Sequence, residues 1–351
     1  MAKRARSEEV EETDRIEGFP HPRETFRLIG QDEALARAAR AIRSGQPPQG
    51  WLLTGPPGIG KATFAYRMSR YLLGYGATDA GPQDLSVPTN DPVSLQVSAG
   101  AHPGLLVLKR GLNPKTGKLM TETSVDVIRR LSGFFGMTSG AGGWRIAIVD
   151  TADEMSDQAA NALLKALEEP PARSMLMLLS NAPGKLLPTI RSRCQRLDLR
   201  PLDETVLAVE LIQHLPKMKD ADRNALAKLA GGSLGAALAL ADEDTLVLAR
   251  DASRTVGEAP MPNVTALFAL ADRVGRTSDR LPMFGGFLIE ALEERIRVRA
   301  QAEGAAGLRP WIGALEQVRA NFDRADALHL EPRQTIVSSI RAIQSASRTA
   351  R

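Results

Sequence analysis

The sequence of 351 residues predicts an α/β fold with a parallel sheet, followed by two parts that are entirely helical. Up to about residue 202, short apolar runs alternate with stretches of helical periodicity. Nearly continuous apolar runs are typical of strands covered on both faces, and their alternation with helices favours parallel pairing. Beyond residue 203 the strand signals fade, and every readable segment has a helical pattern.

Four segments predict buried strands, each a short run of apolar residues bounded by turn or polar residues. They are residues 51–54, 105–110, 145–150 and 174–181. In such a sheet, ligands bind at the carboxyl ends of the strands. We therefore look for a functional site where these four segments end.

Helices are predicted before the first strand, over residues 28–44, and between the strands, over residues 62–73, 123–135 and 157–169. Ser156 is a plausible N-cap of the last of these, and Pro170 ends it. Residues 74–104 are rich in Gly, Pro, Asp and Ser and show little periodicity, so we predict a long connection there.

The remaining chain predicts short helices within 207–215, 224–230 and 235–241, and longer ones after residue 250. Two apolar stripes mark the longer helices: Phe284, Phe287, Leu288, Ala291 and Leu292, and then Trp311, Leu315, Val318 and Phe322. We expect a tail at 1–20, an α/β domain at 21–202, a small helical lid at 203–245 and an all-α domain at 246–351.

The composition is that of an ordinary globular protein, with 43% apolar and 25% charged residues. No run approaches the ~20 apolar residues that span a bilayer. The single cysteine, Cys194, excludes an intrachain disulfide and fits a reducing cytoplasm; we expect a small buried side chain, not a nucleophile. Residues 1–15 mix four basic with five acidic residues, which predicts a solvated, disordered tail and not a signal peptide.

Residues 55–63, GPPGIGKAT, match the phosphate-binding P-loop pattern up to its lysine. The glycines permit a turn whose N–H groups face phosphate oxygens, and Lys61 would pair with the β/γ-phosphates. The following residue is Ala62, which cannot bind magnesium, and Thr63 points roughly 100° away on the helix. The candidate nucleotide-binding residues of this loop are Gly55, Gly58, Gly60, Lys61 and Thr63.

Asp150 ends the strand 145–150, where an ATPase holds the magnesium-side carboxylate; a simple strand cap is the alternative. The next residue is Thr151, which cannot act as a general base. Asp153 and Glu154 lie on the following turn and cannot be assumed to replace it. With defects at Ala62 and Thr151, we expect phosphate binding to remain possible and hydrolysis to be absent.

Two longer motifs carry a family resemblance: ADEMSDQAANALLKALEEPP at 152–171 and LPTIRSRCQRLDLRPL at 187–202. Together with GWLLTGPPGIGKAT at 50–63 and GGWRIAIVD at 142–150, they closely resemble the clamp-loader branch of the AAA+ proteins. The resemblance covers roughly residues 20–240, and the C-terminal part only by its layout. It implies an AAA+ α/β domain, a helical lid and a helical collar that joins a circular pentamer.

The resemblance also implies roles for single residues. Arg193, within Ser-Arg-Cys, matches an arginine finger that reaches a neighbouring subunit's nucleotide; pairing with a local carboxylate is the alternative. Asn181 matches a γ-phosphate sensor or is only a strand cap. Gly235 stands where active relatives carry a phosphate-contacting arginine. Relatives also carry four cysteines within the module at 74–104, which here has none, so we expect no zinc.

The resemblance therefore implies a cytoplasmic, non-hydrolysing clamp-loader subunit of the bacterial DNA polymerase III holoenzyme. It would support ATP-driven loading of the sliding clamp onto primed DNA, in a pentamer with gamma/tau ATPases and delta. The chain would contact primer-template DNA through the complex. Its net charge of +4 is compatible with nucleic acid nearby. The sequence leaves open whether the P-loop binds ATP or ADP without hydrolysing it. The alternatives are an active clamp-loader ATPase of the gamma/tau type and a stand-alone nucleotide-binding module.

Overall fold

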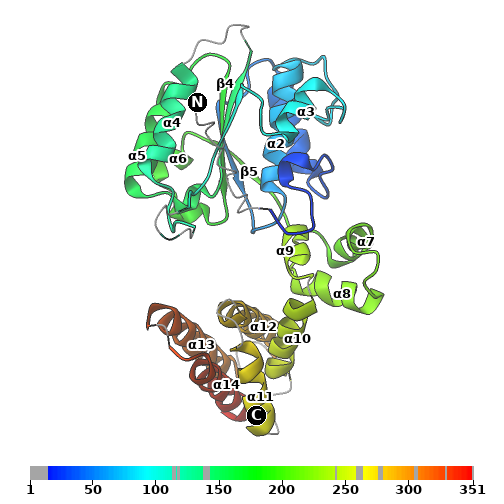
Figure 1. The fold of residues 1–351 in the computed structure, drawn as a ribbon, viewed down its shortest axis with the longest axis vertical. Helices are drawn as coiled ribbons and strands as arrows, with labels where there is room; N and C mark the ends of the chain where they lie inside the picture. Colours follow the sequence, from blue (N-terminus) through cyan, green and yellow to red (C-terminus); the bar gives the residue numbers. More distant parts are fainter. Residues whose placement is uncertain are drawn as a thin grey trace, which may run out of the picture. The chain divides into compact units, whose positions relative to one another are not determined.

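The computed structural model of the chain describes residues 15–112, 116, 119–136, 143–241, 243–257, 264–275, 280–303, 307–328 and 330–349. Contacts divide the chain into two compact units, Met1–Ala239 and Leu240–Arg351 (Figure 1). Residues 1–14 of the predicted tail lie outside the described residues. The predicted boundary between the lid and the all-α domain, at residue 245, lies within the first helix of the second unit. That helix begins at Glu243.

The first unit is built on a five-stranded, wholly parallel sheet with the strand order β2-β3-β4-β1-β5. Its strands are β2 (Leu105–Leu108), β3 (Arg145–Val149), β4 (Ser174–Ser180), β1 (Gly50–Thr54) and β5 (Gln195–Asp198). The predicted parallel sheet is confirmed. The edge strand β5 was not predicted, because only Leu197 among its four residues is buried and no apolar run marks it.

Helices cover both faces of this sheet (Figure 1). On one face lie α1 (Asp32–Arg43), α2 (Lys61–Tyr75) and α3 (Pro92–Ser98); on the other lie α4 (Val125–Gly136), α5 (Asp157–Glu168) and α6 (Pro188–Arg191). Leu53 of β1 packs toward the first group and Leu52 toward the second, as the alternation along a strand requires. Three short 3₁₀ turns complete the layers: Pro22–Glu24, Ala152–Glu154 and Pro183–Lys185.

Two helices between the strands have side-chain N-caps, one of which was predicted and one of which was not. Ser156 is the N-cap of α5, because its Oγ accepts a hydrogen bond from the N–H of Ala159 at 3.3 Å. The prediction of a mere connection over 74–104 was wrong in part, since α3 lies within it. The Asp91 carboxylate caps α3 by accepting from the N–H of Val93 at 2.8 Å, a signal that the surrounding Gly, Pro and Ser residues concealed.

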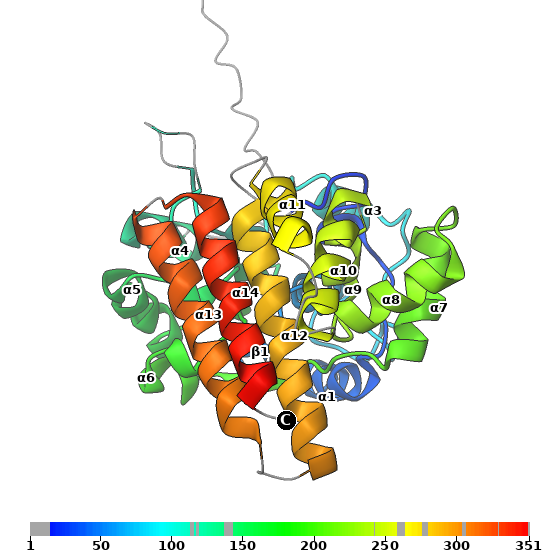
Figure 2. The ribbon, with the colours of Figure 1, turned by 90° about the horizontal axis from the view of Figure 1, so that it is seen from below.

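The first unit ends with the lid helices α7 (Glu204–His214), α8 (Asp220–Leu229) and α9 (Leu234–Ala239). The second unit contains α10 (Glu243–Gly257), α11 (Val264–Val274), α12 (Arg280–Glu303), α13 (Leu308–Leu328) and α14 (Pro332–Thr349). Figure 2 shows α12, α13 and α14 side by side, and their apolar stripes, including Phe284, Leu288 and Trp311, form one core. The predicted helical content is confirmed. Over the described residues, no helix has the length and apolar character to cross a membrane.

Candidate functional site

The P-loop connects the end of β1 to the start of α2 and has the conformation that its glycines allow. Gly58 and Gly60 have φ of +71° and +104°, which L side chains rarely adopt. A Cβ at Gly55 would lie 2.7 Å from the carbonyl oxygen of Leu199. The turn therefore requires glycine at these positions, and it places the N-terminus of α2 beside the loop.

Lys61 is turned back onto its own loop. Its Nζ donates to the carbonyl oxygens of Gly55 and Pro56 and to Oδ1 of Asn181, each at 2.7 Å. An ammonium has three hydrogens, so this chain supplies an acceptor for every one. Burial lowers the pKa of Lys61 to about 8, although Asp150 and Asp153 act to raise it. The structure thus brings together two residues, Lys61 and Asn181, that lie 120 positions apart.

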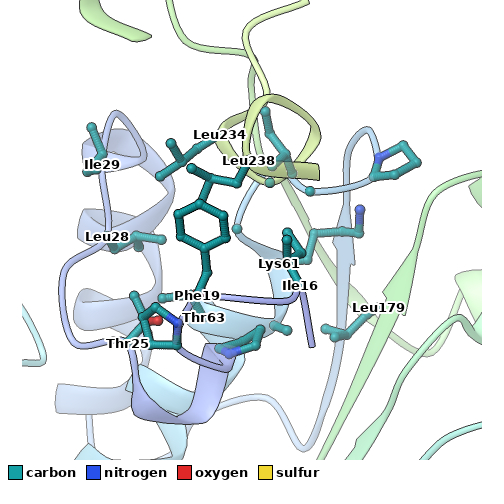
Figure 3. A pocket seen from close by; sticks show the side chains of 18 of the residues that line it. Ile16, Phe19, Thr25, Leu28, Ile29, Lys61, Thr63, Leu179, Leu234 and Leu238 are labelled. Carbon is teal, nitrogen blue, oxygen red and sulfur yellow. The ribbon is translucent and has the colours of Figure 1, made fainter. Parts of the chain in front are cut away.

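A pocket of about 340 Å³ lies beside this loop. Six of the predicted residues line it: Gly58, Gly60, Lys61, Thr63, Asp150 and Asn181. Figure 3 shows the Phe19 ring inside it, with Leu28, Leu234 and Leu238 around the ring and Thr63 beside it. The pocket therefore has a polar wall at the P-loop and an apolar wall from the N-terminal segment and the lid. Sequence reasoning did not find the apolar wall.

The three carboxylates near the strand ends are each engaged within the chain. Asp150 Oδ1 accepts from the N–H of Thr151 at 2.9 Å, and Asp153 Oδ1 accepts from the N–H of Asn181 at 2.9 Å. Glu154 pairs with Arg110 at 2.8 Å. Asp153 and Glu154 thus serve as local partners on the turn after Thr151, the position where an ATPase would orient water.

The loop fits a phosphate group better than it fits a magnesium ion. The glycine turn and the start of α2 offer N–H groups of the kind that bind phosphate oxygens. Position 62 carries no hydroxyl, and Thr63 lies beside Phe19 and Thr25 on the apolar side of the pocket (Figure 3). The residues present would hold phosphate oxygens without the usual set of metal ligands.

The start of the lid helix α9 is bonded directly to the P-loop. Ser233 Oγ donates to the carbonyl of Pro57 at 2.8 Å, and the N–H of Gly235 donates to the carbonyl of Gly58 at 2.9 Å. A Cβ at Gly235 would lie 2.7 Å from Gly58 Cα. We call these contacts between Ser233, Gly235 and the loop the latch. Position 235, where active relatives carry arginine, is thus a place where this backbone leaves no room for a side chain.

Arg193 lies at the opposite end of the sheet. It precedes β5, whereas the P-loop and Asn181 follow the carboxyl ends of β1 and β4. At about 3.3 Å per residue, a strand such as β1 separates the two ends by roughly 15 Å. Arg193 Nη1 donates to the carbonyl of Thr189 at 3.1 Å, and its Nη2 pairs with Glu168 at 3.0 Å. Glu168 is thus the local carboxylate of the alternative prediction. The Arg193 side chain is nevertheless 39% exposed, so the guanidinium still reaches solvent.

Cys194 is half-buried beside Leu167 and Gly50. Burial raises the pKa of its thiol to about 12. A thiolate is required for nucleophilic attack, so this thiol is chemically inert near neutral pH.

Comparison with known proteins identifies the first unit. Residues 30–203 match the family model described as DNA polymerase III, delta subunit. This part of the chain belongs to that family. The chain is similar to the DNA polymerase III subunit delta' of Pseudomonas aeruginosa, with 35% identity over 190 residues, which are 54% of each chain. It is also similar to the DNA polymerase III subunit tau of Escherichia coli, with 26% identity over 87% of this chain and 44% of tau.

The chain thus spans about half the length of the curated relatives that it matches. Among solved structures, it resembles a DNA polymerase III gamma subunit-related protein from Thermotoga maritima at 18% identity. That match covers 90% of this chain and 98% of the other, with a TM-score of 0.38.

Proposed function

We propose that this chain is a clamp-loader subunit of the bacterial DNA polymerase III holoenzyme that does not hydrolyse ATP itself. In this proposal it joins gamma/tau ATPases and delta in a cytoplasmic pentamer, supports loading of the sliding clamp onto primed DNA, and presents Arg193 to a neighbouring ATPase. The relatives with delta' and tau names support the complex. The single cysteine suits the cytoplasm.

The observation that carries the proposal is the position of Arg193 at the amino end of the sheet. A guanidinium at the amino end of the sheet, roughly one strand length of 15 Å from the end that carries the chain's own P-loop, is poorly placed to serve that loop, and its exposure leaves it able to enter a site on another subunit. A rigid guanidinium fork stabilises the charge that develops on a γ-phosphate during transfer. This placement supports a role in trans.

The chain's own P-loop is proposed to hold ATP or ADP without hydrolysis, or to serve only as a structural element. A bound nucleotide would supply phosphate oxygens to the N–H groups at Gly58–Lys61. The charge on Lys61 favours such binding, whereas its bonds to Gly55, Pro56 and Asn181 compete with it. Ala62, Thr151 and Gly235 replace three side chains with which active relatives bind or activate the reacting groups. The Cys-free module at 74–104 is proposed to need no zinc.

The decisive experiment measures ATP turnover by the isolated chain and by a reconstituted clamp-loader complex. We expect no appreciable turnover by the isolated chain. In the complex, Arg193→Ala is expected to lower turnover at the ATPase site that receives the finger by about 10³-fold or more, the range measured for arginine fingers. Arg196→Ala is a matched control, because Arg196 is an exposed arginine on β5 that pairs with Asp198 at 2.6 Å. An unchanged rate with Arg193→Ala would refute the finger but not the proposed role of the chain as a non-hydrolysing member of the complex.

An active ATPase of the gamma/tau type is the second candidate. The similarity to Escherichia coli tau favours it, because that match extends over 87% of this chain. Appreciable ATP turnover by the isolated chain would support this candidate against the first. A chain that bound nucleotide and failed to assemble with any clamp-loader ATPase would instead be a stand-alone nucleotide-binding module.

A further inference from the structure

A second pocket, of about 290 Å³, lies along the C-terminal part of α2, away from the P-loop at the helix N-terminus. The segment 82–89 of the Cys-free module forms one wall, and α2 forms another with Arg67, Arg70 and Tyr75. Phe26 closes a third side. Two arginines of α2 thus line one cavity, against a wall from the module that the proposed function leaves without a role.

Arg70 is 2% exposed, which is rare for a guanidinium without a paired carboxylate. Its Nη2 donates to the carbonyl of Arg23 and, at 3.4 Å, to Ser98 Oγ. Its guanidinium lies 4.2 Å from the centre of the Phe26 ring. Among the described residues no carboxylate pairs with it, and its buried Nε has no hydrogen-bond partner. Burial lowers the pKa of Arg70 to about 10.

Arg67 has a counter-ion, and Arg70 does not share it. Arg67 Nη2 pairs with Asp84 Oδ2 at 2.7 Å, and its Nε and Nη1 donate to the carbonyls of Asp84 and Phe26 at 2.9 and 3.0 Å. The other oxygen of Asp84 accepts from the N–H of Ser86 at 3.0 Å. Two positive charges and one negative charge therefore surround the pocket, which leaves one positive charge on the buried guanidinium.

The loop that forms the wall is held in an uncommon conformation. Leu85 is fully buried and has φ of +58°, a left-handed value that is rare for a bulky residue. Such outliers persist only where the surrounding structure imposes them, and they cluster at ligand sites. Ser86 and Thr89, from the same loop, add hydroxyls to the pocket.

We propose that this pocket binds an oxyanion, either a phosphate or a carboxylate group, which neutralises Arg70. A guanidinium fork matches the paired oxygens of both groups, and the bond between opposite charges strengthens away from water. Phe26, Tyr75, Pro82 and Pro88 give the pocket aromatic and proline walls beside the guanidinium. Free phosphate and a carboxylate-bearing partner are the two sources of this chemistry.

The test measures thermal unfolding of the full chain in sodium phosphate or sodium acetate against sodium chloride at equal ionic strength. We expect a saturable rise in Tm, of about 3–5 °C at a tenfold excess of the anion over its Kd. The anion that acts at the lower concentration identifies the source. A Tm that is the same in all three salts would overturn the proposal.

Two variants separate this pocket from the P-loop, which is itself an anion site. Lys61→Met is expected to keep the rise in Tm, and Arg70→Met is expected to lose it. The reverse result would assign the anion to the P-loop and refute the proposal. This comparison does not depend on ATP turnover, so it can fail while the proposed clamp-loader function stands.

A third variant decides the question if Arg70→Met does not fold. Thr89 is exposed and lines the pocket, so Thr89→Glu supplies a carboxylate from the chain itself. We expect a higher Tm in chloride and no further rise with phosphate or acetate. Thr121→Glu, the same change at an exposed threonine outside the pocket, is the control and should keep the anion response. Equal responses from both variants would contradict the proposal.

Discussion

The two ends of one parallel sheet carry the candidate functional groups in opposite states. At the carboxyl end, Lys61 and Asn181 are hydrogen-bonded to each other, and the lid is bonded to the loop. At the amino end, Arg193 keeps one surface ion pair and remains 39% exposed. Polar groups whose bonds are satisfied inside a chain are held in one arrangement, whereas an exposed arginine can exchange its partner at little cost. The contrast suggests an end that maintains geometry and an end that acts on a neighbour.

The largest change at the carboxyl end is expected from Gly235→Arg, which restores the residue type of active relatives. Its Cβ alone would lie 2.7 Å from Gly58 Cα, so either the lid leaves the loop or the loop shifts. We expect a loss of about 3 kcal/mol in the free energy of unfolding, the upper range for overpacking. Chemical denaturation measures it, and hydrogen exchange at the α9 amides reports release of the lid.

Gly133→Arg is the matched control for that variant. Gly133 lies on the exposed face of α4, and a Cβ there meets no atom within 4 Å. Its stability is expected to stay the same or rise slightly. If both variants had equal stability and equal exchange, the latch would not hold the lid.

Ser233→Ala removes the side-chain hydrogen bond of the latch without adding bulk. It leaves the carbonyl of Pro57 without its donor and removes the acceptor for the N–H of Ala236 at 3.1 Å. Ser233 is 3% exposed, so we expect a loss of about 2 kcal/mol on denaturation. Ser44→Ala, at an exposed serine that donates to Ala41, should change stability by less than about 0.5 kcal/mol. If Ser233→Ala lost no more stability than Ser44→Ala, the two hydrogen bonds of Ser233 would contribute nothing to the free energy of unfolding.

The buried charge of Lys61 predicts a dependence of stability on pH. Its pKa is about 8 in the folded chain, against 10.5 for a lysine in water, so between these values the unfolded chain binds the extra proton. Folding therefore becomes more favourable as pH rises from 8 to 10.5, by up to about 1.4 kcal/mol per pH unit from this group. Subtracting the curve of Lys61→Met from the wild-type curve isolates the effect. A flat difference across that window would show that Lys61 titrates normally.

The smallest effect is expected at the amino end, from Glu168→Ala. The Glu168 carboxylate is half-exposed, so its pair with Arg193 is worth about 0–1 kcal/mol. We expect turnover of the reconstituted complex to fall by no more than about fivefold, because Arg193 keeps its bond to Thr189 and loses only orientation. Glu168→Asp should recover part of the loss. An increase in turnover would mean that Glu168 restrains the finger and does not orient it.

Much of the first unit could be predicted because its strands are buried on both faces. Residues 51–53 and 175–179 are uninterrupted apolar runs, and such runs are recognisable without knowledge of their partners. The edge strand β5 was missed because three of its four residues are exposed. The helix α3 was missed because it has seven residues, too few for a periodic signal among turn residues.

The sequence by itself determined the fold class, the P-loop and the absence of a hydroxyl at Ala62, because these depend on local pattern and residue type. Only the tertiary structure decided what the functional groups contact. Lys61 is bonded to Asn181, the lid is latched to Pro57 and Gly58, and Arg193 stands at the far end of the sheet beside Glu168. These pairs arise where packing brings together chain segments that are far apart in the sequence. A local sequence pattern does not specify which distant segment will be in contact with it.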